Sequence, residues 1–280
     1  MNYRHAYHAG GFADVVKHVV LTSALAILQT KPTALTYLDV YAGKGLYPLA
    51  SEESRKKKEY ETGIEQLLHY AKTHQPSPHI AHYLNSIAKI NLSDTVDVYP
   101  GSPLIAQAFL RPQDKAILCE LHPEEYRWLK KNLYAFSGFS IHCLDAYLGM
   151  KAFLPPKTPR GFLLIDPPFE KPDEFEQMTH ALTHILKHWR QGPIMVWYPI
   201  KSKWSVQKFQ RSLEAYDPLF IDFSMKPFAV NTQLSACGIA LINPPWKIKE
   251  CLETEVLPYL AAALEASWRI YTSSHAVQTR

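Results

Sequence analysis

The residues from Gly161 to Phe169 read GFLLIDPPF, an apolar run followed at once by an acid, two prolines and an aromatic ring. Asp166 and the carbonyl of Pro167 are two neighbouring acceptors, and they match the two hydrogens of an exocyclic amino group. The prolines restrict φ, so the acceptors lose little freedom on binding. The face of Phe169 can stack on a nucleobase. The segment predicts a clamp for an amine on a planar ring, while the alternative interpretation is a strand that ends in a proline turn.

Three further acids follow apolar runs in the same way. They are Asp39 in YLDVYAGKG, Glu120 in AILCELH and Asp145 in FSIHCLDAY. In an open α/β sheet, ligands bind beyond the carboxyl ends of the strands, so four carboxylates are expected along one edge. Because like charges repel, this arrangement indicates a ligand that brings hydrogen-bond donors or positive charge.

The loop after Asp39 contains Gly43 and Gly45, which permit a tight turn and a close approach of a ligand to the backbone. Pro48 takes the place of the third glycine of the dinucleotide pattern, and no G-K-[ST] sequence is present. These departures argue against ATP hydrolysis and mildly against NAD. Glu120 fits a clamp on two ribose hydroxyls, although a strand-end acid paired with a basic side chain is an equal alternative.

The elements that must position these residues follow a regular alternation. A broad apolar stripe predicts a first helix over residues 13–28, and a later helix is expected over 174–189. Seven apolar runs predict strands in the segments 34–45, 116–122, 139–147, 161–169, 193–200, 218–225 and 237–246. The alternation predicts an α/β fold with a doubly wound, mainly parallel seven-stranded sheet, whose last two strands form a terminal hairpin.

The segment 49–95 differs from the rest because it is polar, rich in histidine and helical in period. The sequence QPSPH (Gln75 to His79) is expected to separate two of its helices. We interpret the segment as a small helical insertion within a single domain that spans residues 1–280.

Length and composition limit the class of protein but do not indicate its function. The chain has 280 residues, a net charge of +4 and 47% hydrophobic residues, which allows a full core. No apolar run is long enough for a membrane span, and the N-terminus lacks an apolar signal core, so we expect a cytoplasmic protein. The four cysteines are far apart, and the spacing of His5, His8 and His18 does not fit a metal site. The run RKKKE (Arg55 to Glu59) is either a solvated surface or a contact for phosphates.

The order of these motifs resembles the S-adenosylmethionine-dependent amino-methyltransferases. More narrowly, the chain resembles the RlmJ family of bacterial 23S ribosomal RNA adenine-N6 methyltransferases over nearly its whole length. The resemblance rests on the motifs YRHAYHAGGFADVVKH near the N-terminus, DVYAGKG, YPGSPLIA, ELHP, LIDPPF and INPPWK.

The resemblance implies a Rossmann-like methyltransferase domain with a helical insertion, and it implies a set of site residues. The cofactor S-adenosylmethionine would contact Lys17, His18, Tyr41, Gly43, Ser102, Glu120, Asp145, Ala146 and Asp166. Asp166, Pro167 and Phe169 would be catalytic, and Tyr3 and Arg4 match a tail that lies close to the active site. Tyr41 stands where the family usually has His, and Phe169 stands where many relatives have Tyr.

The implied reaction is methyl transfer to the N6 amino group of one adenine of 23S rRNA by a monomeric enzyme. The N-terminal basic and histidine residues, the RKKKE run, and Lys201 and Lys203 with Trp204 are candidates for an RNA face. One alternative is a DNA adenine-N6 methyltransferase, although no separate sequence-reading domain is visible. Another is a non-catalytic RNA-binding protein, which the intact DPPF sequence disfavours. NPPW (Asn243 to Trp246) is a second amine-clamp motif, but we interpret it as a structural corner far from the cofactor strands.

Overall fold

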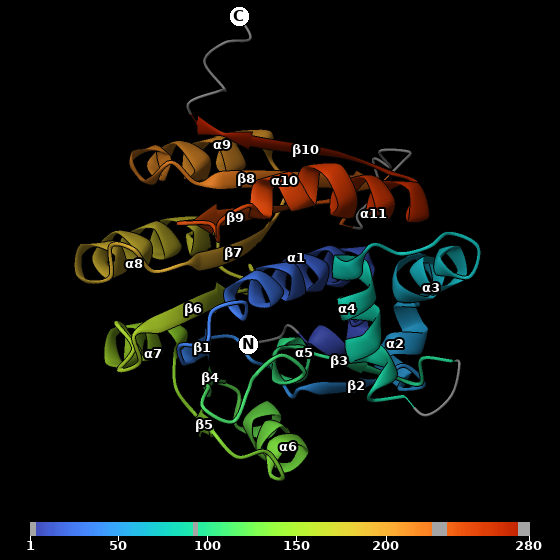
Figure 1. Cartoon of the computed structure of the whole chain (residues 1–280), viewed down its shortest axis with the longest axis horizontal. Coiled ribbons are helices and arrows are strands. Elements are labelled where there is room, and N and C mark those ends of the chain that lie inside the picture. Colours follow the sequence, from blue (N-terminus) through green and yellow to red (C-terminus); the bar gives the residue numbers. More distant parts are fainter. Residues whose placement is uncertain (1–3, 92–94, 226–233, 274–280) are drawn as a thin grey trace, which may run out of the picture.

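The computed structural model describes residues 4–91, 95–225 and 234–273, and a large twisted sheet runs through its centre (Figure 1). Within those ranges the sheet has eight strands, in the spatial order β10 (Ala266–Thr272), β8 (Leu219–Met225), β9 (Ala236–Ile242), β7 (Ile194–Pro199), β6 (Arg160–Ile165), β1 (Leu35–Asp39), β4 (Lys115–Cys119) and β5 (Phe139–His142). From β5 to β7 all neighbours are parallel, and the chain winds outward from β1 in both directions. The predicted doubly wound, mainly parallel α/β sheet is confirmed.

The other three strands are antiparallel to their neighbours. β9 lies between β7 and β8 and pairs with both, so the predicted hairpin of β8 and β9 is confirmed. The predicted number of strands is wrong, because β10 adds an eighth strand along the whole of β8. Its sequence, ASWRIYT, alternates polar and apolar residues and is partly exposed, so no continuous apolar run marks it.

Helices cover both faces of the sheet, as Figure 1 shows. One face carries the long helix α1 (Phe12–Leu28) together with α5 (Ser102–Gln107), α6 (Pro123–Leu133), α10 (Ile248–Cys251) and α11 (Leu257–Ala263). The other carries α7 (Ala146–Phe153), α8 (Glu174–His188) and α9 (Lys203–Ser212). Because strand side chains alternate, Tyr37 and Phe162 pack in the first layer, and Leu38 and Leu163 pack in the second.

The segment between β1 and α5 contains several short helices. Its elements are β2 (Leu46–Pro48), α2 (Glu52–Lys57), the π-helical turn η2 (Glu61–Glu65), α3 (Gln66–Ala71), α4 (Pro78–Ala88) and β3 (Val98–Pro100). β2 and β3 pair antiparallel and bring the two ends of the segment together. The predicted break QPSPH separates α3 from α4, although its last two residues, Pro78 and His79, already belong to α4. The division of the chain into one domain with an insertion stays a prediction, and residues 92–94 of that insertion lie outside the described residues.

Short turns complete the described chain, namely the 3-10 turns η1 (His5–Tyr7) and η3 (Glu214–Tyr216) and the π-helical turn η4 (Leu252–Val256). No helix among the described residues combines the length and the apolar character that crossing a bilayer requires.

Two positions in the sheet differ from the prediction. β5 ends at His142, so Asp145 does not end a strand but caps α7, where it accepts from the backbone N–H groups of Tyr147 and Leu148. NPPW follows β9, which is an inner strand rather than the last one. Because β9 is antiparallel to β7, Asn243 lies at the sheet edge opposite the carboxyl ends of the parallel strands. The side-chain amide of Asn243 donates to the backbone carbonyls of Arg190 and Gly192, which supports the role of NPPW as a structural corner.

Candidate active site

A cleft opens at the carboxyl edge of the parallel strands, beside the start of α1. Its empty volume is about 630 Å³, a figure that includes the open mouth. The residues that line it come from the N-terminal segment, the loop after β1, the start of α5, the end of β4 and the loop after β6. They are His5, Lys17, His18, Tyr41, Ala42, Gly43, Tyr47, Gly101, Ser102, Glu120, Glu125, Asp166, Pro167 and Pro168.

The loop after β1 holds its shape through glycine and through Glu120. Gly43 has φ of +60°, and a Cβ atom there would lie 2.2 Å from the Tyr47 hydroxyl, so a larger residue does not fit. The backbone N–H of Gly43 donates to Glu120 Oε2 at 2.9 Å, and that of His122 donates to Oε1 at 2.7 Å. Burial raises the pKa of Glu120, and these two donors partly offset the effect. A carboxylate is thus held against the glycine loop at the wall of the cleft.

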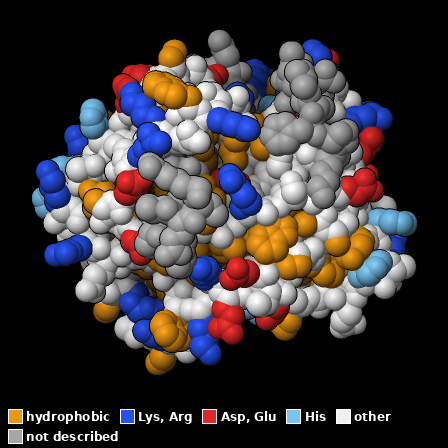
Figure 2. Space-filling model, turned by 90° about the horizontal axis from the view of Figure 1, so that it is seen from above, with side chains coloured by type: hydrophobic (Ala, Val, Ile, Leu, Met, Phe, Trp, Pro, Cys, Tyr) orange, Lys and Arg blue, Asp and Glu red, His pale blue; other side chains and the backbone are white. Residues whose placement is uncertain are grey.

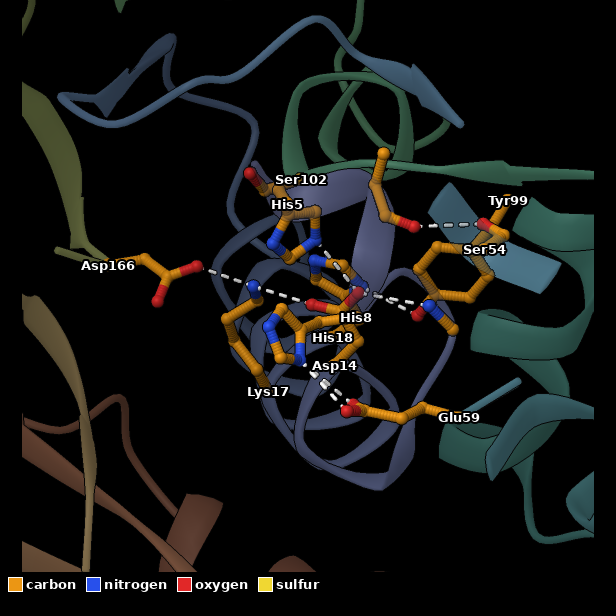
Figure 3. A network of polar contacts seen from close by, with 12 residues as sticks. His5, His8, Asp14, Lys17, His18, Ser54, Glu59, Tyr99, Ser102 and Asp166 are labelled. Carbon is orange, nitrogen blue, oxygen red and sulfur yellow. Dashed lines mark hydrogen bonds and ion pairs between the residues drawn. The ribbon is translucent and has the colours of Figure 1, made fainter. Parts of the chain in front are cut away.

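Lys17 joins two acids across the cleft floor, as Figure 3 shows. Its Nζ atom lies 2.8 Å from Asp14 Oδ1 and 2.5 Å from Asp166 Oδ2, and the lysine is only 4% exposed. Burial lowers the pKa of Lys17, but Asp14 and Asp166 outweigh it and raise the pKa above its ordinary value. The lysine therefore stays charged, and Asp166 faces a fixed cation.

The second acid of this group, Asp14, is shared with the N-terminal segment. His5 Nε2 lies 2.9 Å from Asp14 Oδ2, and the same oxygen accepts from the backbone N–H of Gly10. Burial opposes ionisation of Asp14, yet His5 and Lys17 hold its pKa well below the ordinary value. His8 makes a separate contact with Glu59, at 3.0 Å. Each of these two histidines therefore contacts a carboxylate.

Asp39, the last residue of β1, is fully buried beneath the cleft. Its Oδ2 atom accepts from the hydroxyls of Ser102 and Tyr37 at 2.7 and 2.9 Å, and its Oδ1 atom accepts from the Tyr41 backbone N–H. Burial raises its pKa from 3.8 to about 6 despite these donors. This acid connects β1, the glycine loop and the start of α5.

His18 presents an unsatisfied nitrogen in the wall of the cleft. Its Nδ1 atom contacts the hydroxyl of Tyr99 at 2.8 Å, and Tyr99 in turn contacts Tyr83 at 3.0 Å. Nε2 is buried and has no hydrogen-bond partner among the described residues. Burial, and then the charge of Lys17, lower the pKa of His18 well below its ordinary value, so the ring is neutral. A buried polar atom without a partner normally indicates a missing water or ligand.

The DPPF sequence follows β6 directly and turns over the cleft. Asp166, Pro167 and Pro168 line the cleft, whereas Phe169 does not. Phe169 has φ of 51°, and its half-buried ring packs against Phe175 at 4.9 Å and Trp197 at 6.1 Å between ring centroids. Asp166 and the two prolines therefore line the site, while the ring of Phe169 packs against the layer of α8 and β7.

This cleft and its DPPF turn belong to a chain with known relatives. Residues 32–275 match the sequence model of the family described as "Ribosomal RNA large subunit methyltransferase D, RlmJ". The chain belongs to this family.

Relatives of the family match over almost their full length. "Ribosomal RNA large subunit methyltransferase J" of Haemophilus influenzae is 37% identical, with 96% of this chain and 98% of the relative covered. The protein of the same name from Escherichia coli strain K12 is 34% identical, with 94% of each chain covered. A crystal structure of a Legionella pneumophila protein is 33% identical, superposes with a TM-score of 0.86, and covers 95% of this chain and 99% of that one.

The structure brings most of the predicted site residues together. Eight of them line the cleft: Lys17, His18, Tyr41, Gly43, Ser102, Glu120, Asp166 and Pro167. Asp145, Ala146 and Phe169 are not among the lining residues, since the first two begin α7 and the third packs into the helical layer. Their roles in the family site stay predictions. Tyr3 lies outside the described residues.

Sequence reasoning misses several contributors to the cleft. The sequence predicts only that Asp14 stabilises the start of a helix. In the structure, this acid is one of the two carboxylates that pair with Lys17. The signal is present, because an acid three residues before a lysine lies on the same face of a helix. Tyr47 is not predicted to contact the site, and His5 is predicted only as one of the N-terminal histidines of a candidate RNA face. The two rings pack at 4.8 Å between centroids. No local pattern indicates that contact.

Proposed function

We propose that this chain transfers a methyl group from S-adenosylmethionine to the N6 amino group of one adenine of 23S rRNA. The observation that carries the proposal is the DPP turn, with Asp166 and Pro167 in a cleft that also contains the glycine loop and Glu120. The relatives named as large-subunit rRNA methyltransferases support the substrate class.

The lining residues fit the proposed cofactor. Glu120 places a carboxylate where ribose hydroxyls can donate, and the unpartnered Nε2 of His18 and the charged Lys17 offer polar contacts to the amino-acid portion. We also assign Tyr41, Gly43, Ser102, Asp145 and Ala146 to this role from the family resemblance. When bound, S-adenosylmethionine supplies an electrophilic methyl group on a sulfonium.

The chain's own residues then act on the amine. Lys17 engages Oδ2 of Asp166, which leaves Oδ1 and the Pro167 carbonyl to accept the two amino hydrogens of adenine. These two hydrogen bonds would favour a tetrahedral nitrogen, so that its lone pair can bond the methyl carbon as the carbon–sulfur bond breaks. The amine would then lose one proton to Asp166 Oδ1 or to water. The adenine must leave its stack to reach the cleft, and the face of Phe169 is proposed to contact the base.

The test is methyl transfer from labelled S-adenosylmethionine to unmodified 23S rRNA. The wild type should yield N6-methyladenine at one site, and Asp166→Asn should reduce the rate by at least ~100-fold, because one of the two amine acceptors is altered. Asp97→Asn, at an exposed acid that is not among the lining residues, is the matched control and should keep full activity.

The same assay separates the alternatives. Transfer to DNA but not to RNA would keep the clamp and reject the rRNA substrate. Binding of S-adenosylmethionine without transfer to either nucleic acid would indicate a non-catalytic protein. We further propose that the enzyme acts as a monomer in the bacterial cytoplasm, where its substrate is made, and sedimentation velocity would measure its mass in solution.

A further inference from the structure

An exposed aromatic and basic surface lies at the start of α9. Trp204 is 71% exposed, and Lys201 and Lys203 beside it are also exposed. We call these three residues the α9 patch. Figure 2 looks down on this side of the molecule and shows more Lys and Arg side chains on its left half, where Figure 1 places α9, than on its right half. A large exposed ring next to two cations is a surface that suits an unpaired RNA strand.

The patch is held on a rigid element. Ser202 is the N-cap of α9, and its hydroxyl accepts from the backbone N–H of Ser205 at 3.3 Å. Val206 and Phe209 anchor the helix in the core, since they are only 5% and 2% exposed. Trp204 therefore projects from an anchored first turn, and a base that stacks on it meets a ring already in place.

The patch is structurally continuous with the DPPF turn. β7 and β6 are parallel neighbours, so the chain leaves both strands at the same edge of the sheet. A row of packed rings connects the two elements, with centroid distances of 5.1 Å from Phe209 to Phe175 and 4.9 Å from Phe175 to Phe169. RNA that delivers an adenine to Asp166 is therefore expected to pass over the start of α9.

The charges around Trp204 are unequal. Lys208 lies 5.6 Å from the centre of the Trp204 ring, but its Nζ atom also contacts Glu176 at 2.8 Å, which offsets its charge. The positive charge for phosphates therefore comes mainly from Lys201 and Lys203.

We propose that the α9 patch binds the RNA strand next to the target adenine. Trp204 stacks on an unpaired neighbouring base, and Lys201 and Lys203 contact the flanking phosphates. This inference rests on the proposed function, because it assumes that RNA enters the cleft.

The experiment compares Trp204→Ala with Trp246→Ala in methyl transfer to a 23S rRNA transcript. Trp246 is a matched control because it is 82% exposed and follows β9 at the opposite sheet edge. Trp204→Ala should raise KM for RNA about 5- to 150-fold, the range for loss of one stacked base. The kcat value and KM for S-adenosylmethionine should change less than about 2-fold, because the patch binds RNA outside the cleft. Trp204→Phe should restore most of the affinity, since it keeps a ring.

The lysines are tested through the salt dependence of RNA binding. Lys201→Ala with Lys203→Ala should reduce the slope of log affinity against log salt by about 1.4, whereas Lys247→Ala with Lys249→Ala should not change it. If Trp204→Ala and Trp246→Ala have equal KM values for RNA while the wild type is active, the proposed role of the α9 patch in RNA binding is wrong. The proposed function of the chain would still stand. A wild type that methylates no RNA would overturn both.

Discussion

At the scale of single residues, Lys17 has the largest expected effect on stability. It is the buried cation between Asp14 and Asp166, and its replacement by Met would leave two carboxylates without that partner. We expect Lys17→Met to lower the free energy of unfolding by about 3–5 kcal/mol, measured by urea denaturation. The double variant Asp14→Asn, Lys17→Met should recover part of this loss, because it removes one of the two buried carboxylates that lose the lysine. Equal stability of wild type and Lys17→Met would show that the bridge contributes nothing.

Asp39 gives a prediction about pH at the same scale. Burial raises its pKa in the folded state from 3.8 to about 6, so the folded protein holds this proton more tightly than the unfolded chain does. The stabilisation is therefore fully present below pH 3.8 and is lost as the pH rises through 6. We expect a decrease of about 3 kcal/mol across this window.

The measurement is urea unfolding from pH 4 to pH 7 for the wild type and for Asp39→Asn, which cannot titrate. As the pH rises, the wild type should lose unfolding free energy relative to Asp39→Asn. A difference that is independent of pH would contradict the raised pKa of Asp39.

At the scale of elements, a partly buried hydrogen bond connects α7 to α8. The Tyr147 hydroxyl donates to Glu174 Oε1 at 3.0 Å, and Glu174 is the first residue of the helix that follows the DPPF turn. Tyr147→Phe would leave the 5% exposed carboxylate without this donor, so we expect a loss of about 1–3 kcal/mol in unfolding free energy. Tyr134→Phe is the matched control, since Tyr134 is 87% exposed. The midpoint of its unfolding transition in urea should equal that of the wild type.

At the scale of the whole molecule, β10 protects the edge of the sheet. It pairs with all seven residues of β8, from Leu219 to Met225. Truncation before Ala266 would expose that edge and the apolar side chains beneath it, so we expect aggregation in light scattering. Arg269→Ala removes the ion pair of an exposed arginine with Asp222 and its contact with the Tyr271 ring, but leaves the strand pairing intact. This variant should stay monodisperse, with a loss of about 1 kcal/mol. A soluble, stable truncated chain would contradict this role of β10.

The amino-acid sequence by itself predicts the order of most elements and the acids along the cleft, whereas Lys17, His18, Tyr41 and Ser102 come from the family resemblance. Apolar runs and the helical period are local signals, so they predict the strands β1, β4, β6 and β7 and the helices α1 and α8 closely. The carboxyl ends of parallel strands share one edge, and this rule alone brings Asp39, Glu120 and Asp166 near each other. Asp145 is the exception, because β5 ends three residues earlier than its apolar run suggests.

Only the tertiary structure decides the contacts between distant residues. Lys17 meets Asp166 across 149 positions of the chain, and no local pattern specifies that pair. The insertion of β9 between β7 and β8, the edge strand β10 and the packing of Phe169 against Phe175 likewise depend on which surfaces meet when the layers close. Local sequence predicts the place and type of most elements, whereas pairing across the fold depends on the total free energy of packing all of them together.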